Sequence, residues 1–181
     1  MDLSEILGIL SNGSLYTPEL AETKAPASPG YYSIYVDSAA SLPGAFAAHL
    51  ESRGSLLIYL GIATTSILAR LIEQDLRHMR ASTFFRGIGA VLGYRPPQGS
   101  LIGKKNRNNY RFVPADTRSI IRWIDDHLKV TWHEEDPAIA ATEVAAIRHF
   151  APLLNTTHNP RPLAELAELR AECRRIASET L

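Results

Sequence analysis

The stretch SLLIYLGIATTSILARL, residues 55–71, joins a buried strand to an amphipathic helix and anchors the interpretation of the whole chain. Residues 56–60 are almost all apolar, which is typical of a strand in the interior of a domain. Tyr59 interrupts this run, Gly61 follows it, and Arg70 lies on the helix that comes next. A strand that only filled a core would need none of these three residues, so each is a candidate for a role beyond packing.

The composition predicts one domain in a reducing compartment. The chain has 181 residues, of which 45% are hydrophobic, enough for a core that folds alone. A single cysteine, Cys173, excludes an internal disulfide framework and fits a cytoplasmic location. The first ten residues carry acids and no basic cluster, unlike a secretory signal. No apolar run approaches the roughly 20 residues that span a bilayer, so we expect no membrane association.

A formal net charge of zero hides a strong asymmetry. Residues 76–115 contain no Asp or Glu but hold eight of the 19 Lys and Arg residues. The rest of the chain has 11 basic and 19 acidic residues. This distribution predicts one face suited to a polyanion.

Periodicity and turn residues predict an α+β domain with three strands. The expected strands cover residues 31–36, 56–61 and 127–134, and the expected loops cover residues 11–30 and 93–112. The expected helices cover residues 3–10, 43–52, 66–80, 82–92, 117–127, 139–150 and 163–178.

Glu143 breaks the pattern of its own helix. At 100° per residue, Val144, Ile147 and Phe150 share one apolar arc, and Glu143 falls inside it. A carboxylate that faces a core is costly unless it is paired or bound to a cation. Two interpretations remain open: a structural ion pair, or a metal-binding carboxylate at the floor of a cleft.

The helix at residues 66–80 shows the same kind of misfit. Arg70 flanks its apolar arc, where arginine is ordinarily a surface residue with a buried stem. Asp75 and His78 lie inside the arc; we expect Asp75 to pair with a basic side chain and His78 to be a core histidine or a weak catalytic candidate. Asn155, after the Glu143 helix, is by itself an ordinary turn residue.

Together these residues resemble the GIY-YIG nuclease superfamily. Gly30, Tyr31 and Tyr32 in PGYYSIYV stand in place of Gly-Ile-Tyr, and Tyr59, Leu60 and Gly61 stand in place of Tyr-Ile-Gly. Arg70 follows on the next helix, as the family's arginine does. The family's later element is matched in EVAAIRHFAPLLN by Glu143, Pro152 and Asn155. The resemblance covers about residues 29–155.

The resemblance implies a fold and a domain organisation. The family fold is a small antiparallel three-stranded sheet flanked by helices, here with a helical and basic-loop insertion at about residues 81–125. We therefore expect an N-terminal helix and loop at 1–28, a nuclease domain at 29–160, and a C-terminal helix at 161–181 that packs on the domain.

The resemblance also implies a metal-dependent endonuclease that hydrolyses phosphodiester bonds. Tyr32 and Tyr59 would project into one cleft and bind the scissile phosphate or the attacking water. Arg70 would bind phosphate oxygens in a bidentate manner. Glu143 would hold one Mg²⁺ or Mn²⁺ ion, since Mg²⁺ is satisfied by one carboxylate with waters and substrate oxygens.

Further roles follow from the same resemblance. Gly30 and Gly61 would let the backbone approach closely, and Asn155 would orient the Glu143 loop. Ile62 stands where several family members have lysine. The identity of the general base therefore remains open; Tyr59 is the first candidate and His78 the second.

The stretch without Asp or Glu, residues 76–115, is expected to bind the phosphates of a nucleic-acid backbone. These contacts would be salt-dependent and largely independent of nucleotide sequence. The residues assigned to this contact are Arg77, Lys104, Lys105, Arg107 and Arg111. Of its aromatic residues, Phe84, Phe85 and Phe112 are expected to pack in a core, whereas Tyr94 and Tyr110 are candidates for stacking on bases.

The family's repair, homing and restriction enzymes place DNA ahead of RNA as the substrate. A catalytically inactive nucleic-acid-binding protein on the same scaffold is the first alternative, and Ile62 is the feature in its favour. A structural protein whose basic stretch meets an acidic partner is the second alternative. The monomer and the homodimer both remain open.

Overall fold

The computed structural model describes residues 5, 8–10, 13–135 and 140–180. In this part of the chain, three strands form one antiparallel sheet in the order β2-β1-β3. The strands are β1 (Gly30–Val36), β2 (Leu57–Ala63) and β3 (Leu128–Glu134). Tyr32 in the central strand lies opposite Gly61 in β2 and Trp132 in β3. The predicted α+β fold with a three-stranded antiparallel sheet is confirmed.

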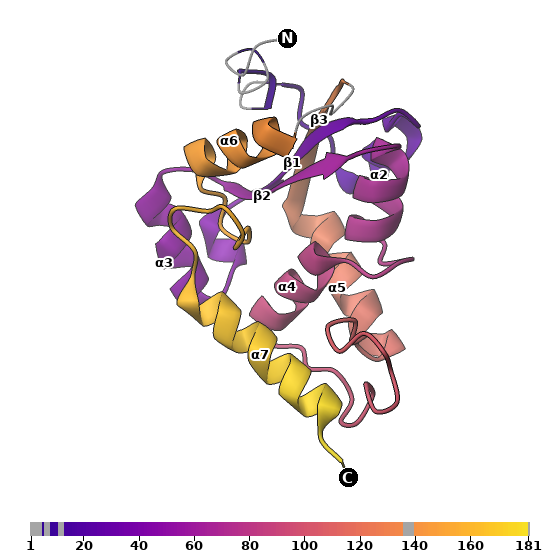
Figure 1. Cartoon of the computed structure of the whole chain (residues 1–181). Coiled ribbons are helices and arrows are strands. Elements are labelled where there is room, and N and C mark those ends of the chain that lie inside the picture. The colour runs from indigo at the N-terminus through magenta and orange to yellow at the C-terminus, as the bar shows by residue number, and fades with distance from the viewer. Residues whose placement is uncertain (1–4, 6–7, 11–12, 136–139, 181) are drawn as a thin grey trace.

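Helices cover both faces of this sheet (Figure 1). Their bounds are α2 (Pro18–Lys24), α3 (Gly44–Arg53), η2 (Leu68–Leu76), α4 (Thr83–Val91), α5 (Pro114–His127), α6 (Ala140–Phe150) and α7 (Ala164–Ser178), with a short 3₁₀ turn η1 (Ala39–Ser41). No helix in the described residues is both long and apolar enough to cross a bilayer.

The alternation of side chains along the strands separates two cores. Tyr32 and Ile34 of β1 belong to the larger core, which includes side chains of η2, α4 and α5. Tyr31 of β1 and Leu60 of β2 point to the opposite face, where Ile147 of α6 completes a smaller core. Residues from α6 and from α4 therefore reach β2 from different sides.

The insertion after β2 is built into the larger core. Phe84, Phe85 and Phe112 are buried there, as predicted. Tyr110 is also buried and Tyr94 packs against the same core, which contradicts the expectation that these two rings are free to stack on bases. The loop at residues 93–112 does form, and it carries the lysines in an exposed position.

Two local predictions about helices were wrong. Residues 18–24, expected as loop, form α2 because the Thr17 side chain accepts a hydrogen bond from the Leu20 amide and Pro18 occupies the first turn. The helix expected at 66–80 is the shorter π-helix η2, whose i→i+5 bonding continues in the Arg77 amide to Ile72 carbonyl bond of 2.9 Å.

Several element boundaries also differ from the predictions. α5 begins at Pro114, three residues early, because proline is well tolerated in a first helical turn. Of the helix expected at 3–10, residues 5 and 8–10 are helical and the rest lies outside the described residues. Residue 139, the expected start of the sixth helix, also lies outside them.

The C-terminal helix α7 packs against α4 on the side of the molecule away from α6 (Figure 1). Leu166, Cys173 and Ala177 are the residues of α7 that are buried in the larger core. This packing places Arg170 of α7 within hydrogen-bonding distance of Thr83, the first residue of α4.

Candidate active site

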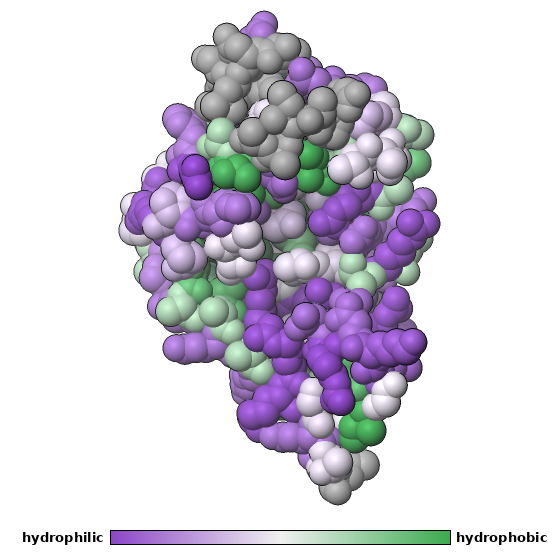
Figure 2. Space-filling view, viewed as in Figure 1, coloured by the Kyte–Doolittle hydropathy of each residue, from purple (hydrophilic) through white to green (hydrophobic). Residues whose placement is uncertain are grey.

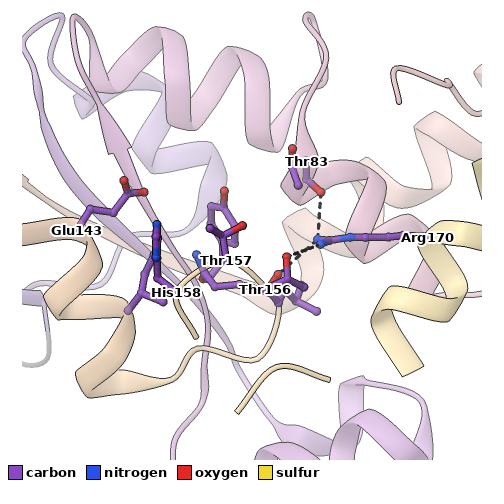
Figure 3. A pocket seen from close by; sticks show the side chains of 10 residues that line it. Thr83, Glu143, Thr156, Thr157, His158 and Arg170 are labelled. Atoms are coloured by element: carbon purple, nitrogen blue, oxygen red, sulfur yellow. Dashed lines mark hydrogen bonds between the residues drawn. The ribbon is translucent and has the colours of Figure 1, made fainter. Parts of the chain in front are cut away.

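Glu143, in the first turn of α6, lines a pocket of about 300 Å³. The pocket walls come from β2, α4, α6, α7 and the segment that follows α6, through the residues Tyr59, Thr83, Glu143, Ile147, Leu154, Asn155, Thr156, Thr157, His158 and Arg170. Figure 3 shows Glu143 and His158 on one side of this pocket and Thr83 and Arg170 on the other. Four elements and the segment after α6 therefore meet around one carboxylate.

The Glu143 carboxylate is half-buried and forms no hydrogen bond or ion pair with any residue that the structure describes. Burial raises its pKa, and the nearby side chains of Arg70 and His158 oppose that rise. Of the two interpretations left open by the sequence, the structural ion pair is not formed within the described residues. The carboxylate remains available to a ligand in the pocket.

One carboxylate without a protein partner fits a divalent ion of the magnesium type. No group of three or more His, Cys, Asp or Glu side chains that could enclose a metal occurs in the described part of the chain. Mg²⁺ does not need such a group, because it commonly takes one or two carboxylates and keeps waters and substrate oxygens as its other ligands. The donor set at Glu143 therefore suits a metal that is shared with substrate.

The two tyrosines of the predicted site are neighbours, but only Tyr59 lines the pocket. The Tyr59 ring lies 6.4 Å from the Tyr32 ring and 5.2 Å from Phe84 in α4, centroid to centroid. Burial raises the pKa of Tyr59, and the charge of Asp75 raises it further. The expected common cleft is not formed, because the Tyr32 hydroxyl is turned toward Asp75.

Asp75 is the centre of a buried network. Its Oδ2 accepts a hydrogen bond of 2.5 Å from the Tyr32 hydroxyl, and its Oδ1 accepts bonds of 2.7 Å from Arg70 and 2.6 Å from Ser82. Burial raises the pKa of Asp75, while the Arg70 guanidinium and the two hydroxyls oppose that rise. The expected pairing of Asp75 with a basic side chain is confirmed, and the partner is Arg70.

Arg70 keeps donors free for a further partner. Only its Nη1 bonds to Asp75, and its side chain is 28% exposed in a hollow shared with Ile62 and Arg80. Because Asp75 is bonded to both Tyr32 and Arg70, it fixes a strand residue and a helix residue of the predicted site to each other.

The two motif glycines are required by packing inside the sheet. A Cβ on Gly61 would lie 2.3 Å from Cζ and Oη of Tyr32, and one on Gly30 would lie 2.1 Å from the His133 carbonyl oxygen. The expected close approach of backbone is present at both positions. The group that approaches Gly61 is the Tyr32 ring, and the group that approaches Gly30 is the backbone of β3. Both close approaches are contacts within the fold.

Asn155 holds the segment after α6 against the edge strand β2. Its amide accepts a 2.9 Å hydrogen bond from the Leu60 N–H and donates one of 2.9 Å to the Leu60 carbonyl. The Leu154 amide bonds to the Ile58 carbonyl at 2.8 Å. Asn155 therefore positions the pocket wall through its bonds to the backbone of Leu60, next to Tyr59. The family resemblance had implied that Asn155 would orient the Glu143 loop.

The GIY-YIG catalytic domain family model matches residues 30–174. The chain belongs to the GIY-YIG family. The match extends from β1 into the last part of α7 and so includes every element that lines the pocket. Comparison with curated proteins gave no match, and comparison with solved structures gave none either. Membership of the family supports nuclease activity on nucleic acid in general.

Like Tyr32 and Arg70, two further residues predicted for the site of this GIY-YIG protein do not line the pocket of Glu143. Both ring nitrogens of His78 are buried without a hydrogen-bond partner among the described residues, and the ring stacks on Phe85 at 4.3 Å. Burial lowers the His78 pKa to about 4, with help from the charges of Arg111 and Arg86. His78 is therefore a neutral core histidine.

The other displaced residue is Arg77, whose guanidinium binds Glu22 of α2 and, at 2.7 Å, Asp125 of α5. Those carboxylates satisfy its charge, so the expected phosphate contact has no free donor group at Nε or Nη2. Lys104, Lys105, Arg107 and Arg111 lie on or beside the exposed loop, where their predicted contact with nucleic acid stays a prediction.

Arg170 is a residue of the GIY-YIG pocket that the sequence interpretation missed. At 100° per residue it falls at the edge of the arc of Leu166, Cys173 and Ala177 on α7, a misfit similar to that of Glu143. The sequence therefore carried a signal for Arg170. It carried no signal that α4 and β2 would lie beside this residue. His158 was missed because it is an exposed residue in an irregular segment.

Proposed function

We propose that this GIY-YIG protein is a metal-dependent endonuclease that hydrolyses phosphodiester bonds, with DNA ahead of RNA as its substrate. The observation that carries the proposal is the half-buried Glu143 carboxylate, which has no protein partner among the described residues and faces a pocket bordered by Tyr59 and Arg170. When bound, Mg²⁺ or Mn²⁺ would offset negative charge on the phosphate and stabilise the leaving oxygen.

The protein side chains would position the phosphate. Arg70, fixed at one end by Asp75, has N–H groups left to donate to phosphate oxygens. Because burial raises its pKa, the Tyr59 hydroxyl is held as a hydrogen-bond donor, and we assign it to a phosphate oxygen. Asp75, Ser82 and Tyr32 would keep Arg70 in place, so little rearrangement is needed when charge develops.

Cleavage of labelled single-stranded DNA, double-stranded DNA and RNA tests the proposal, each with Mg²⁺, with Mn²⁺ and with a chelator. We expect metal-dependent cutting that Glu143→Gln reduces by about 100-fold or more, the cost of losing one main electrostatic stabiliser. Glu51→Gln, which removes an exposed carboxylate on α3, is the matched control and should cut as wild type does.

A second candidate function is nucleic-acid binding without turnover, and Ile62 at the position of a family lysine favours it. Wild-type protein that retains DNA but cuts none of the three substrates would support this candidate. Ile62→Lys would then be the variant that distinguishes a missing lysine from a wrong substrate. Cutting by Glu143→Gln at the wild-type rate would overturn the metal assignment.

A further inference from the structure

A second hollow, of about 290 Å³, lies next to the pocket of Glu143. Its lining consists of Thr83, Arg86, Asn108, Tyr110, Arg170 and Arg174. Thr83 and Arg170 line both hollows, so the two are joined across the Arg170 side chain. Figure 2 shows that hydrophilic side chains dominate the half of this face that lies over α4, α7 and the 93–112 loop.

Three arginines meet at this hollow without an acidic partner. Within the described residues, Arg86, Arg170 and Arg174 have no carboxylate at ion-pair distance, and the hollow has no Asp or Glu in its lining. Arg77 and Arg95, by contrast, are paired with carboxylates; Arg95, for example, lies 2.7 Å from Glu172. The charge at this hollow is therefore left uncompensated.

The hydrogen bonds of these guanidinium groups are long and go to neutral atoms. Arg170 donates to the Thr156 hydroxyl at 3.4 Å and to the carbonyls of Thr83 and Leu154 at 3.5 and 3.3 Å. Its buried Nε has no partner in the described structure. Arg86 donates to Asn109 at 3.2 Å. Donors of this kind have capacity left for a charged acceptor.

The clustering of these three arginines is unfavourable for the stability of the fold, and the fold nevertheless retains it. Burial lowers the pKa of both Arg86 and Arg170, and the nearby charge of Arg174 lowers both further. Gly87, in the interior of α4, leaves the space for Arg170, since a Cβ there would lie 2.6 Å from Arg170 Nη2. Glycine inside a helix costs about 0.5–1 kcal/mol relative to alanine. The Arg86 guanidinium lies 5.7 Å above the Tyr110 ring, which favours a cation at that position.

We infer that Arg86, Arg170 and Arg174 form a phosphate-binding subsite for a nucleic-acid strand, taking a backbone phosphate that neighbours the one cut at Glu143. Guanidinium groups match phosphate oxygens in geometry and charge, and an anion would relieve the repulsion among the three arginines. The inference rests on the proposed function, because the shared wall at Arg170 aligns the subsite with the Glu143 pocket. It gives the strand a path from α6 toward α4 and α7.

Binding of labelled single- and double-stranded oligonucleotides by Glu143→Gln protein tests the subsite without any need for cleavage. In that background, the double substitution Arg86→Gln and Arg174→Gln should weaken binding about 10-fold and reduce the slope of log K against log salt by about 0.7–0.9 for each lost phosphate contact. Arg175→Gln is the matched control, because Arg175 is adjacent on α7, exposed, and paired with Glu179. It should leave affinity and slope unchanged.

Thermal unfolding shows whether the double variant is as stable as its parent, so that a loss of binding can be separated from a loss of folding. The double variant should unfold at the same temperature as its parent or higher, because repulsion is relieved. Equal affinities for the double variant and Arg175→Gln would overturn the subsite. A double variant that binds oligonucleotide normally but is no longer stabilised by millimolar inorganic phosphate would assign the hollow to free phosphate and overturn the strand assignment. Failure of wild type to cut would remove the proposed function alone and leave these binding results standing.

Discussion

Replacing Asn155 with alanine should lower the stability of the fold markedly, although the side chain is polar and lies at a pocket wall. Asn155 is 7% exposed and bonds both backbone groups of Leu60 at 2.9 Å, in the manner of a neighbouring strand. β2 is an edge strand, so Leu60 finds no replacement partner in the sheet. The substitution removes two bonds and leaves a buried N–H and a buried C=O unsatisfied.

The magnitude follows from those two groups. A typical hydrogen bond contributes about 1 kcal/mol net, but each buried group left without a partner costs about 1–3 kcal/mol. Water entering through the adjacent pocket would recover part of this loss. We therefore expect Asn155→Ala to lower the free energy of unfolding by about 2–4 kcal/mol. Asn159, which donates 2.7 Å bonds to the Pro152 and Asn155 carbonyls, supports the same segment.

Urea unfolding followed by circular dichroism measures the change. For a slope of about 2 kcal/mol per molar urea, the midpoint should fall by about 1–2 M. Thr157→Ala, an exposed residue on the same segment, is the control and should stay within about 0.5 kcal/mol of wild type. A loss below about 0.5 kcal/mol for Asn155→Ala would show that the segment is held by other contacts and refute the reasoning.

Three further changes have expected outcomes. Gly61→Ala should destabilise the fold by about 1–3 kcal/mol in thermal melts, because its Cβ would meet the buried Tyr32 hydroxyl; an unchanged melt would contradict this packing. The folded-state pKa of His78 is lowered to about 4, so the unfolded chain binds more protons between about pH 4 and pH 6.5. The stability contributed by the neutral ring is therefore complete above about pH 6.5 and is lost as the pH falls toward 4. The loss in the free energy of unfolding is up to about 3 kcal/mol. His78→Asn, which tolerates the positive φ of 54°, should lack this part of the acid loss, and an identical pH profile would argue against it. Replacing Lys104 and Lys105 with Glu should weaken DNA binding and flatten its salt dependence, and an unchanged slope would remove that loop from the interface.

The strands and most helices were predictable because they depend on short-range signals. The aromatic and β-branched residues at 31–36 and the apolar run at 56–60 needed no tertiary information to indicate strands. Glu143 was predictable as a site residue for a related reason: a carboxylate inside an apolar arc is visible in one helix alone. α2 was missed because Thr17 and Pro18, which start it, lie in a stretch that is otherwise typical of a loop.

The geometry of η2 could not be predicted from apolar spacing. Its hydrophobic residues satisfy an α-helical arc, yet the backbone bonds are i→i+5. The wider turn ends at Leu76, so His78, which periodicity placed on the helix, follows it with a positive φ. The general-base role considered for His78 depended on that periodicity, and the ring instead stacks in the core on Phe85.

Fold class, family and the candidate residues whose types conflict with their local pattern could all be read from the amino-acid sequence. Which of these residues meet depends on the packed structure: Asp75 joins Tyr32 to Arg70, Asn155 pairs with Leu60, and Tyr32 turns away from the pocket. The packed structure alone brought Arg86 and Arg170 together from α4 and α7. Periodicity records the faces of single elements, whereas the position of a charge relative to another element depends on packing between segments far apart in the chain.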